Sequence, residues 1–115
     1  MPQHIRKYWG KRHGRQQLNF NWGAINANSI VHVAASEYLP VTDPDAHGGF
    51  VDQNHQRFIG AANVTVSNIA PHGAPWDPNN GVTFVVNVDW PSPIYIVTDI
   101  TVFDEGPAEI QNSCP

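Results

Sequence analysis

A strict alternation of apolar and polar residues, found twice near the end of the chain, most constrains what this sequence can fold into. Residues 81–90 and 93–103 each place mostly apolar side chains at every second position, which is typical of a strand with one face on a core. The predicted core-facing residues are Val82, Phe84, Val86, Val88 and Trp90 in the first strand, and Ile94, Ile96, Thr98, Ile100 and Val102 in the second. Because Pro91 and Pro93 cannot continue a hydrogen-bonded ladder, the sequence predicts that the two strands form a hairpin.

Three further segments show the same period of two. Residues 18–22, 29–35 and 57–69 alternate, and two segments rich in Pro and Gly, 36–56 and 70–80, separate the strands. The residues that share one face are Leu18, Phe20 and Trp22 in the first segment and Ala62, Val64 and Val66 in the third. The segment 29–35 is apolar on both faces, with Val31, Val33 and Ala35 on one and Ile30, His32 and Ala34 on the other, so it is either a central strand or covered by a partner. No amphipathic helix pattern appears, so the sequence predicts an all-β fold, an antiparallel β-sandwich of about six to seven strands. A chain of 115 residues has room for one such domain.

The charges are strongly segregated along the chain. Five of the six Lys and Arg residues lie before residue 16, and every acid lies at or after Glu37. The sequence therefore predicts a basic N-terminal arm over residues 1–17, a β-sandwich domain over 18–104 and a polar C-terminal tail over 105–115. The arm residues expected to act in assembly are Arg6, Lys7, Tyr8, Trp9, Lys11, Arg12 and Arg15.

Two partners fit such an arm: the acidic body of a neighbouring copy, or nucleic acid. The acidic remainder of the chain argues against nucleic acid, so a neighbouring copy is favoured. Charged residues are only 14% of the chain, against about 25% in typical domains. We therefore expect part of the surface to be covered by further copies or by another protein.

Several classes of protein are disfavoured by the sequence. Cys114 is the single cysteine, so no intrachain disulfide can form. The basic N-terminal residues are not followed by an apolar run, which predicts synthesis in the cytoplasm without a signal peptide. No stretch approaches the roughly 20 apolar residues that a membrane-spanning helix needs. We expect no membrane association.

Metal binding and catalysis have little support. Asp43 and Asp45 stand in the spacing of a calcium loop, but the position that calls for a bidentate Glu is Asn54. The six histidines are scattered, and no pair has the close spacing of a zinc site. No nucleophile elbow, phosphate loop or recognisable pair of catalytic carboxylates occurs. The sequence predicts a protein that is not an enzyme and carries no metal or cofactor.

Aromatic residues beside the loops are the more promising feature. Trp76, Trp90 and Tyr95 lie at or next to loop ends, where polar side chains are close in sequence. Proteins hold sugars by covering the apolar face of the ring with an aromatic side chain while charged or amide groups bind the hydroxyls. The candidate ligand-binding residues are Arg57, Trp90, Tyr95, Asp89, Trp76 and His72. The alternative for Trp90 is that it ends a core strand and is simply buried.

The second half of the chain resembles the H-type lectin domain, the fold of snail agglutinins and of the C-terminal domain of discoidins. The matching residues are Arg57, Ala62-Asn63-Val64-Thr65-Val66-Ser67, the turn at residues 68–73, the strand ending at Trp90, Ile94-Tyr95 and Thr101-Val102-Phe103. The resemblance implies an antiparallel sandwich, assembly as a trimer and a sugar site between protomers. By position, it assigns Arg57, Trp90 and Tyr95 to that site.

The chain departs from the family pattern at four points. Pro91 follows the Trp where a polar residue, often His, is usual, and the spacing from Trp to Tyr is one residue shorter. Residues 73–83 contain an insertion. The family also takes an Asp from its N-terminal segment, whereas this chain has no acid before Glu37. Asp43, Asp45 and Asp89 are the candidate replacements.

Together these features predict a non-enzymatic, oligomeric surface-recognition module that binds glycan at a subunit crevice. Its expected partners are copies of itself, as a trimer or a multiple of three, a glycan, and other proteins of a larger assembly such as a phage particle. The alternative is a purely structural virion decoration, cement or tail subunit whose N-terminal arm clamps neighbouring subunits.

Overall fold

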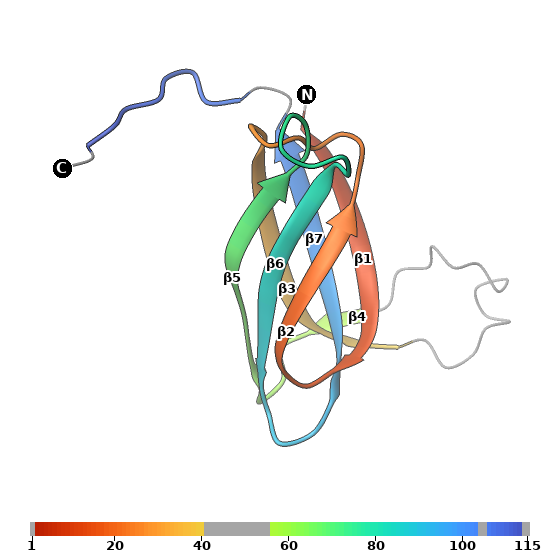
Figure 1. Ribbon diagram of the computed structural model, residues 1–115. Coiled ribbons are helices and arrows are strands. Elements are labelled where there is room, and N and C mark those ends of the chain that lie inside the picture. Colours follow the sequence, from red (N-terminus) through yellow and green to blue (C-terminus); the bar gives the residue numbers. More distant parts are fainter. Residues whose placement is uncertain (1, 41–55, 104–105, 114–115) are drawn as a thin grey trace, which may run out of the picture.

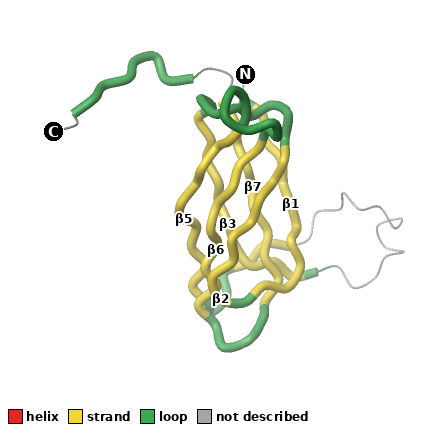
Figure 2. Tube along the Cα trace, viewed as in Figure 1, coloured by secondary structure: helices red, strands yellow, loops and turns green. Residues whose placement is uncertain are grey.

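The computed structural model describes residues 2–40, 56–103 and 106–113, and the strands within the first two ranges form a β-sandwich of two antiparallel sheets (Figure 1). The seven strands are β1 (Gln3–Arg12), β2 (Gly14–Asn21), β3 (Ile30–Leu39), β4 (Gln56–Phe58), β5 (Asn63–His72), β6 (Gly81–Asp89) and β7 (Ile94–Phe103). Figure 2 shows strands and loops but no helix over the described residues. The four-stranded sheet has the order β1-β7-β3-β4 and the three-stranded sheet the order β2-β6-β5. The predicted all-β antiparallel sandwich is confirmed.

The core lies between the two sheets and uses the faces that the alternation predicted. Its largest fully buried side chain is Phe84 of β6, and Ile96 and Ile100 of β7 are likewise 0% exposed. The remaining members of the buried cluster are Leu18, Ile25, Val31, Val82, Val86, Val88 and Val102. Burying one such large apolar side chain contributes about 1.5–3 kcal/mol relative to leaving it in water. Trp90 is 38% exposed and lies outside this core.

The strands β6 and β7 do not form the predicted hairpin. Strand β6 pairs with β2 and β5, while β7 pairs with β1 and β3 in the opposite sheet. Both strands also bury an outward-facing residue, Val85 at 5% and Val97 at 0% exposure, as central strands do. Since Pro91 and Pro93 carry no backbone N–H, the short connection between the strands crosses from one sheet to the other rather than closing a ladder.

The predicted N-terminal arm is not confirmed as a separate segment. Residues 3–12 form β1, which pairs with β7 along its whole length, and β2 begins at Gly14. A bulge between Tyr8 and Gly10 shifts the register by one residue, and Gly10 adopts a φ of 75°. The extra residue, Trp9, is turned into the core, where it packs against Phe84 at 6.2 Å between ring centroids.

The bulge explains why the sequence did not indicate a strand here. The side chains from His4 to Tyr8 point to the two faces in turn, but the charged Lys7 stands at a core-side position and the bulge then shifts the period by one residue. No uninterrupted alternation of apolar and polar residues results. Strand β1 is also an edge strand, and Lys7 faces the core side of the sheet while remaining exposed. Edge strands commonly carry such charges, which discourage pairing with other chains.

Several predicted boundaries change. The strand expected over residues 57–69 is divided into β4 and β5, and β5 runs on to His72. Most of the expected loop at 36–56 lies outside the described residues, including Asp43, Asp45 and Asn54 with its calcium hypothesis, whereas Ser36–Leu39 belong to β3. Residues 106–113 have no regular structure and are exposed. In the described parts of the chain there is no helix suited to crossing a membrane.

Candidate functional site

The outer face of the four-stranded sheet gathers charged and aromatic side chains from all four of its strands. On β7, Tyr95, Val97 and Asp99 alternate with the core-facing residues and point outward. The register places Arg6 of β1 beside Asp99 and Lys11 beside Tyr95. We call this surface the Asp99 face. It is formed by Arg6, Tyr8, Lys11, Ser36, Tyr38, Arg57, Tyr95 and Asp99.

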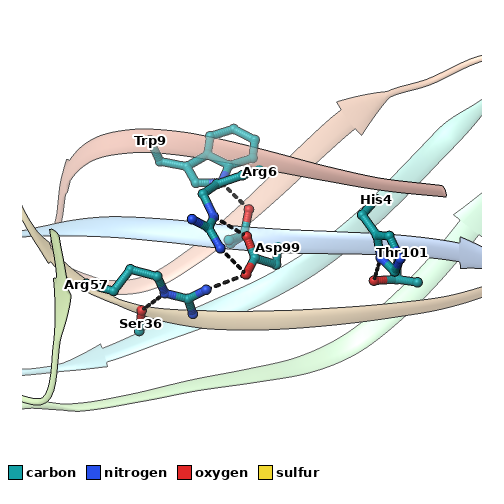
Figure 3. Close-up of polar contacts among 8 residues, drawn as sticks. His4, Arg6, Trp9, Ser36, Arg57, Asp99 and Thr101 are labelled. Carbon is teal, nitrogen blue, oxygen red and sulfur yellow. Dashed lines mark hydrogen bonds and ion pairs between the residues drawn. The ribbon is translucent and has the colours of Figure 1, made fainter. Parts of the chain in front are cut away.

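Asp99 binds two guanidinium groups. Arg6 donates from Nε to Oδ1 at 2.7 Å and from Nη2 to Oδ2 at 3.1 Å (Figure 3). Arg57 reaches across β3, donating from Nε to Ser36 Oγ at 2.9 Å and from Nη1 to Asp99 Oδ2. The hydrogen bonds from Arg6, together with the charge of Arg57, hold the pKa of Asp99 below its ordinary value, although partial burial opposes this. Two cations sharing one carboxylate leave the cluster with a net positive charge.

All three tyrosines of the chain lie on this face. The ring of Tyr38 is 4.9 Å from that of Tyr8 and 5.4 Å from that of Tyr95, measured between centroids. Lys11 places its ammonium group 5.4 Å from the centre of the Tyr95 ring. Tyr38 is only 5% exposed, and this burial raises the pKa of its hydroxyl. The outer face therefore carries its own small apolar layer over Val97.

Two hollows flank Asp99 on this face. One, of about 430 Å³, is lined by His4, Ile5, Arg6, Asp99 and Thr101. The other, of about 380 Å³, is lined by His32, Val33, Ala34, Ile69, Asp99 and Thr101. Thr101 stands between His4 and His32 in the register, and His4 Nδ1 lies 2.9 Å from its hydroxyl. Both hollows are lined by polar and apolar groups together, the mixture that small polar ligands require.

The three-stranded sheet carries a second, different cluster on its outer face. His72 Nε2 lies 2.6 Å from Asn19 Oδ1, and His72 Nδ1 lies 2.7 Å from the carbonyl oxygen of Asn79. Thr83 donates its hydroxyl to the same Asn19 oxygen at 2.9 Å. Asp77 comes within 3.6 Å of His72 Nδ1. These residues border a hollow of about 410 Å³ that is also lined by Asn21, Ala70 and Pro71.

The predicted ligand-binding residues are not all brought together. Arg57 and Tyr95 share the Asp99 face, but His72 belongs to the cluster on the other sheet. Trp76 is 85% exposed in the loop between β5 and β6. Asp89 ends β6 and pairs with Asn63, so it faces away from the core on the three-stranded sheet.

Trp90 begins the connection between the two sheets. It is 38% exposed.

The predicted assembly residues are also divided. Arg6, Tyr8 and Lys11 belong to the Asp99 face, whereas Trp9 is a core residue that donates from Nε1 to Thr98 Oγ1 at 2.8 Å. The guanidinium of Arg12 lies 5.8 Å from the centre of the Trp9 ring.

The other two arm residues lie apart from that face. Lys7 projects at the edge of the four-stranded sheet. Arg15 stands on β2 in the three-stranded sheet, where it pairs with Asn87 of β6.

Sequence reasoning missed Asp99, Ser36 and Tyr38 as members of a site. Asp99 did carry a signal, because it is a carboxylate in the middle of a strand that is otherwise uncharged. Its two guanidinium partners lie 93 and 42 residues away, so only the strand order could reveal the cluster.

No group of three or more His, Cys, Asp or Glu side chains that could hold a metal ion occurs among the described residues. Within the same residues, every buried side-chain nitrogen or oxygen has a hydrogen-bond partner. On the Asp99 face the carboxylate is already bonded to Arg6 and Arg57, so any ligand it binds must compete with or extend these contacts.

Comparison with protein-family models, with curated proteins and with solved structures found no match. The resemblance to H-type lectin domains therefore stays a prediction, carried by the residues from Arg57 to Phe103.

Proposed function

We propose that this protein is a non-enzymatic glycan-recognition module and that the Asp99 face is its binding surface. The observation that carries the proposal is that Tyr95 and the Arg6–Asp99–Arg57 cluster lie on the same outer face, with Tyr95 four residues along β7 from Asp99. An aromatic ring offers a surface to the apolar side of a sugar, and guanidinium and carboxylate groups bind its hydroxyls in pairs. Arg57 and Tyr95 are also the residues that the lectin resemblance assigns to sugar binding.

The proposed module works as an oligomer, a trimer or a multiple of three, within a larger assembly such as a phage particle. The two hollows beside Asp99 are lined by a single copy of the chain and lie open on its surface. A neighbouring copy would cover them and complete a crevice, as in the lectins that the sequence resembles. The low charged fraction of 14% is consistent with a surface that is partly covered.

The purely structural alternative loses its main support. It depended on an N-terminal arm available to clamp a neighbour, whereas residues 3–12 pair with β7 of their own chain. A structural role in the particle would then have to use another part of the surface.

A glycan array probed with the intact oligomer tests the proposal. We expect Tyr95→Ala to weaken binding about tenfold, because the apolar face of the sugar loses its aromatic partner. Tyr95→Phe keeps the ring and should retain most of the affinity. Trp76→Ala is the matched control, since Trp76 is 85% exposed and lies outside the Asp99 face. If the oligomer binds no glycan, or if Trp76→Ala weakens binding as much as Tyr95→Ala, the proposal fails.

A further inference from the structure

The Asp99 face has more positive than negative charge, and this imbalance bears on the class of ligand. We infer that the Asp99 face takes an anionic oligosaccharide, whose carboxylate or sulfate groups bind beside Arg6, Arg57 and Lys11. The inference rests on the proposed function and adds the chemical class of the glycan.

The charge surplus is local and runs against the rest of the molecule. The whole chain has a formal charge of −4, yet this face carries Arg6, Arg57 and Lys11. Among residues 2–40, 56–103 and 106–113, Asp99 is the one carboxylate on the outer side of the four-stranded sheet, because Glu37 pairs with the core-facing Ile96. A surplus of cations held together on an acidic protein favours the approach of an anion.

The two guanidinium groups are positioned before any ligand arrives. Asp99 fixes both of them, and Ser36 orients Arg57 through its Nε. Guanidinium groups bind carboxylate and sulfate oxygens with paired, charge-assisted hydrogen bonds. Because the side chains are already ordered, binding loses less conformational entropy than it would with mobile arginines. An anionic group of the ligand would be the second negative charge beside Asp99, and it would balance the positive charges of Arg6 and Arg57.

The cluster is within reach of a ligand in solution. The side chains of Arg6, Asp99 and Arg57 are 39%, 31% and 30% exposed, and the hollow beside Arg6 opens next to them. A neutral sugar would use these groups only as hydrogen-bond donors and acceptors. An acidic sugar adds an attraction between opposite charges that weakens with added salt.

The spacing of the positive groups favours a ligand longer than one sugar. Lys11 stands opposite Tyr95, which is four residues along β7 from Asp99, a separation of about 13 Å at the rise of a strand. One sugar ring does not span that distance. A chain with acidic groups at intervals can reach the guanidinium pair and the ammonium group together, passing over Tyr8, which pairs with Val97 between those two positions.

The test measures dissociation constants of the full-length oligomer for three hexasaccharides of equal length. The probes are a neutral chitin fragment, a hyaluronan fragment with carboxylates only, and a heparin fragment with sulfates and carboxylates. We expect at least one charged probe to bind about tenfold or more tightly than the neutral one, with a preference that shrinks as salt is added. The comparison of hyaluronan with heparin separates carboxylate from sulfate recognition.

Two variants locate the effect. Arg57→Gln should remove most of the preference for the charged probe, and Arg57→Lys should restore part of it, because the charge returns without the paired geometry. Arg15→Gln is the matched control, with the same loss of charge on the opposite sheet, and should keep the preference. Arg6→Gln replaces Arg57→Gln if the latter does not fold, as judged by circular dichroism.

The possible outcomes separate the two proposals. Equal affinity for neutral and charged hexasaccharides overturns the anion preference and leaves glycan recognition standing. Absence of binding to every saccharide overturns both. An equal loss in Arg57→Gln and Arg15→Gln shows diffuse attraction and overturns the assignment to this face. Single-stranded DNA of six nucleotides, if it binds as tightly as the best saccharide, overturns the saccharide class.

Discussion

The outer faces of the two sheets differ far more than their inner faces do. Both sheets send alternating apolar residues into one shared core. Outside, the four-stranded sheet carries the ionic and aromatic Asp99 face, whereas the three-stranded sheet carries mainly amides and hydroxyls. The outward residues of the latter are Arg15, Gln17, Asn19, Asn21, Asn63, Thr65, Ser67, Ala70, His72, Thr83, Val85, Asn87 and Asp89.

This difference teaches where specificity can reside in such a fold. The inner faces must match each other in shape and polarity, so they have little freedom to vary. The outer faces meet solvent or a partner, so their chemistry is set by what they bind. On the Asp99 face a few charges are concentrated around one carboxylate, and on the other face neutral hydrogen bonds gather around Asn19 and His72.

The largest expected effect tests whether the Asp99 face is anchored to the core at all. Trp9→Ala should lower the free energy of unfolding by about 3 kcal/mol, because a large side chain packed on Phe84 and bonded to Thr98 is lost. Denaturant unfolding measures the change. Trp76→Ala, an equally large truncation at an exposed site, should change stability by less than about 0.5 kcal/mol. Equal effects would mean that β1 is not part of the folded sheet.

An intermediate effect is expected for the carboxylate that holds the Asp99 face together. Asp99→Asn should destabilise the protein by about 1–2 kcal/mol at neutral pH, since both guanidinium groups lose their anion. Chemical unfolding at several pH values measures it. Asp89→Asn on the opposite sheet is the matched control and should be near neutral.

The same carboxylate predicts a dependence of stability on pH. The folded protein holds the pKa of Asp99 below its ordinary value of 3.8. Over the interval between the two pKa values the unfolded chain binds more protons, so stability is present above about pH 4 and is lost as the pH falls through the folded pKa. Asp99→Asn should flatten this part of the curve. An unchanged acid slope in the variant would contradict the ion-pair cluster.

The smallest effect is expected on the outer face of the three-stranded sheet. Thr83→Val removes one hydroxyl that donates to Asn19, keeps the shape of the side chain, and should cost about 0.5–1 kcal/mol. Thermal unfolding at high and low salt measures it, and the loss should not depend on salt because no charge is removed. If the loss of stability in Thr83→Val depended strongly on salt, the proposed contrast between an ionic and an uncharged outer face would be contradicted.

Local alternation predicted which residues face the core, and it did so for β6 and β7 almost throughout. Val82 to Val88 and Ile96 to Val102 are buried at the expected positions. The prediction succeeded because the side chains of a strand alternate regardless of which strands lie beside it. The same rule placed Asp99 and Tyr95 outward, although it did not say what they would meet.

The pairing of strands could not be predicted in the same way. The connection at Pro91 was expected to close a hairpin, but β6 and β7 lie in opposite sheets. Strand β1 was missed because the bulge at Gly10 interrupts its period and because its exposed edge is charged. Pairing depends on contacts between residues far apart in sequence, and a local pattern contains no information about them.

By itself, then, the sequence determined an all-β chain, its core-facing positions and an unusual separation of charge between its first residues and the remainder. Only the tertiary structure decided that Arg6, Asp99 and Arg57 meet on one face, because they come from β1, β7 and β4. The physical reason is that burial acts residue by residue along a strand, whereas the order of strands in a sheet is selected by the packing of the whole sandwich.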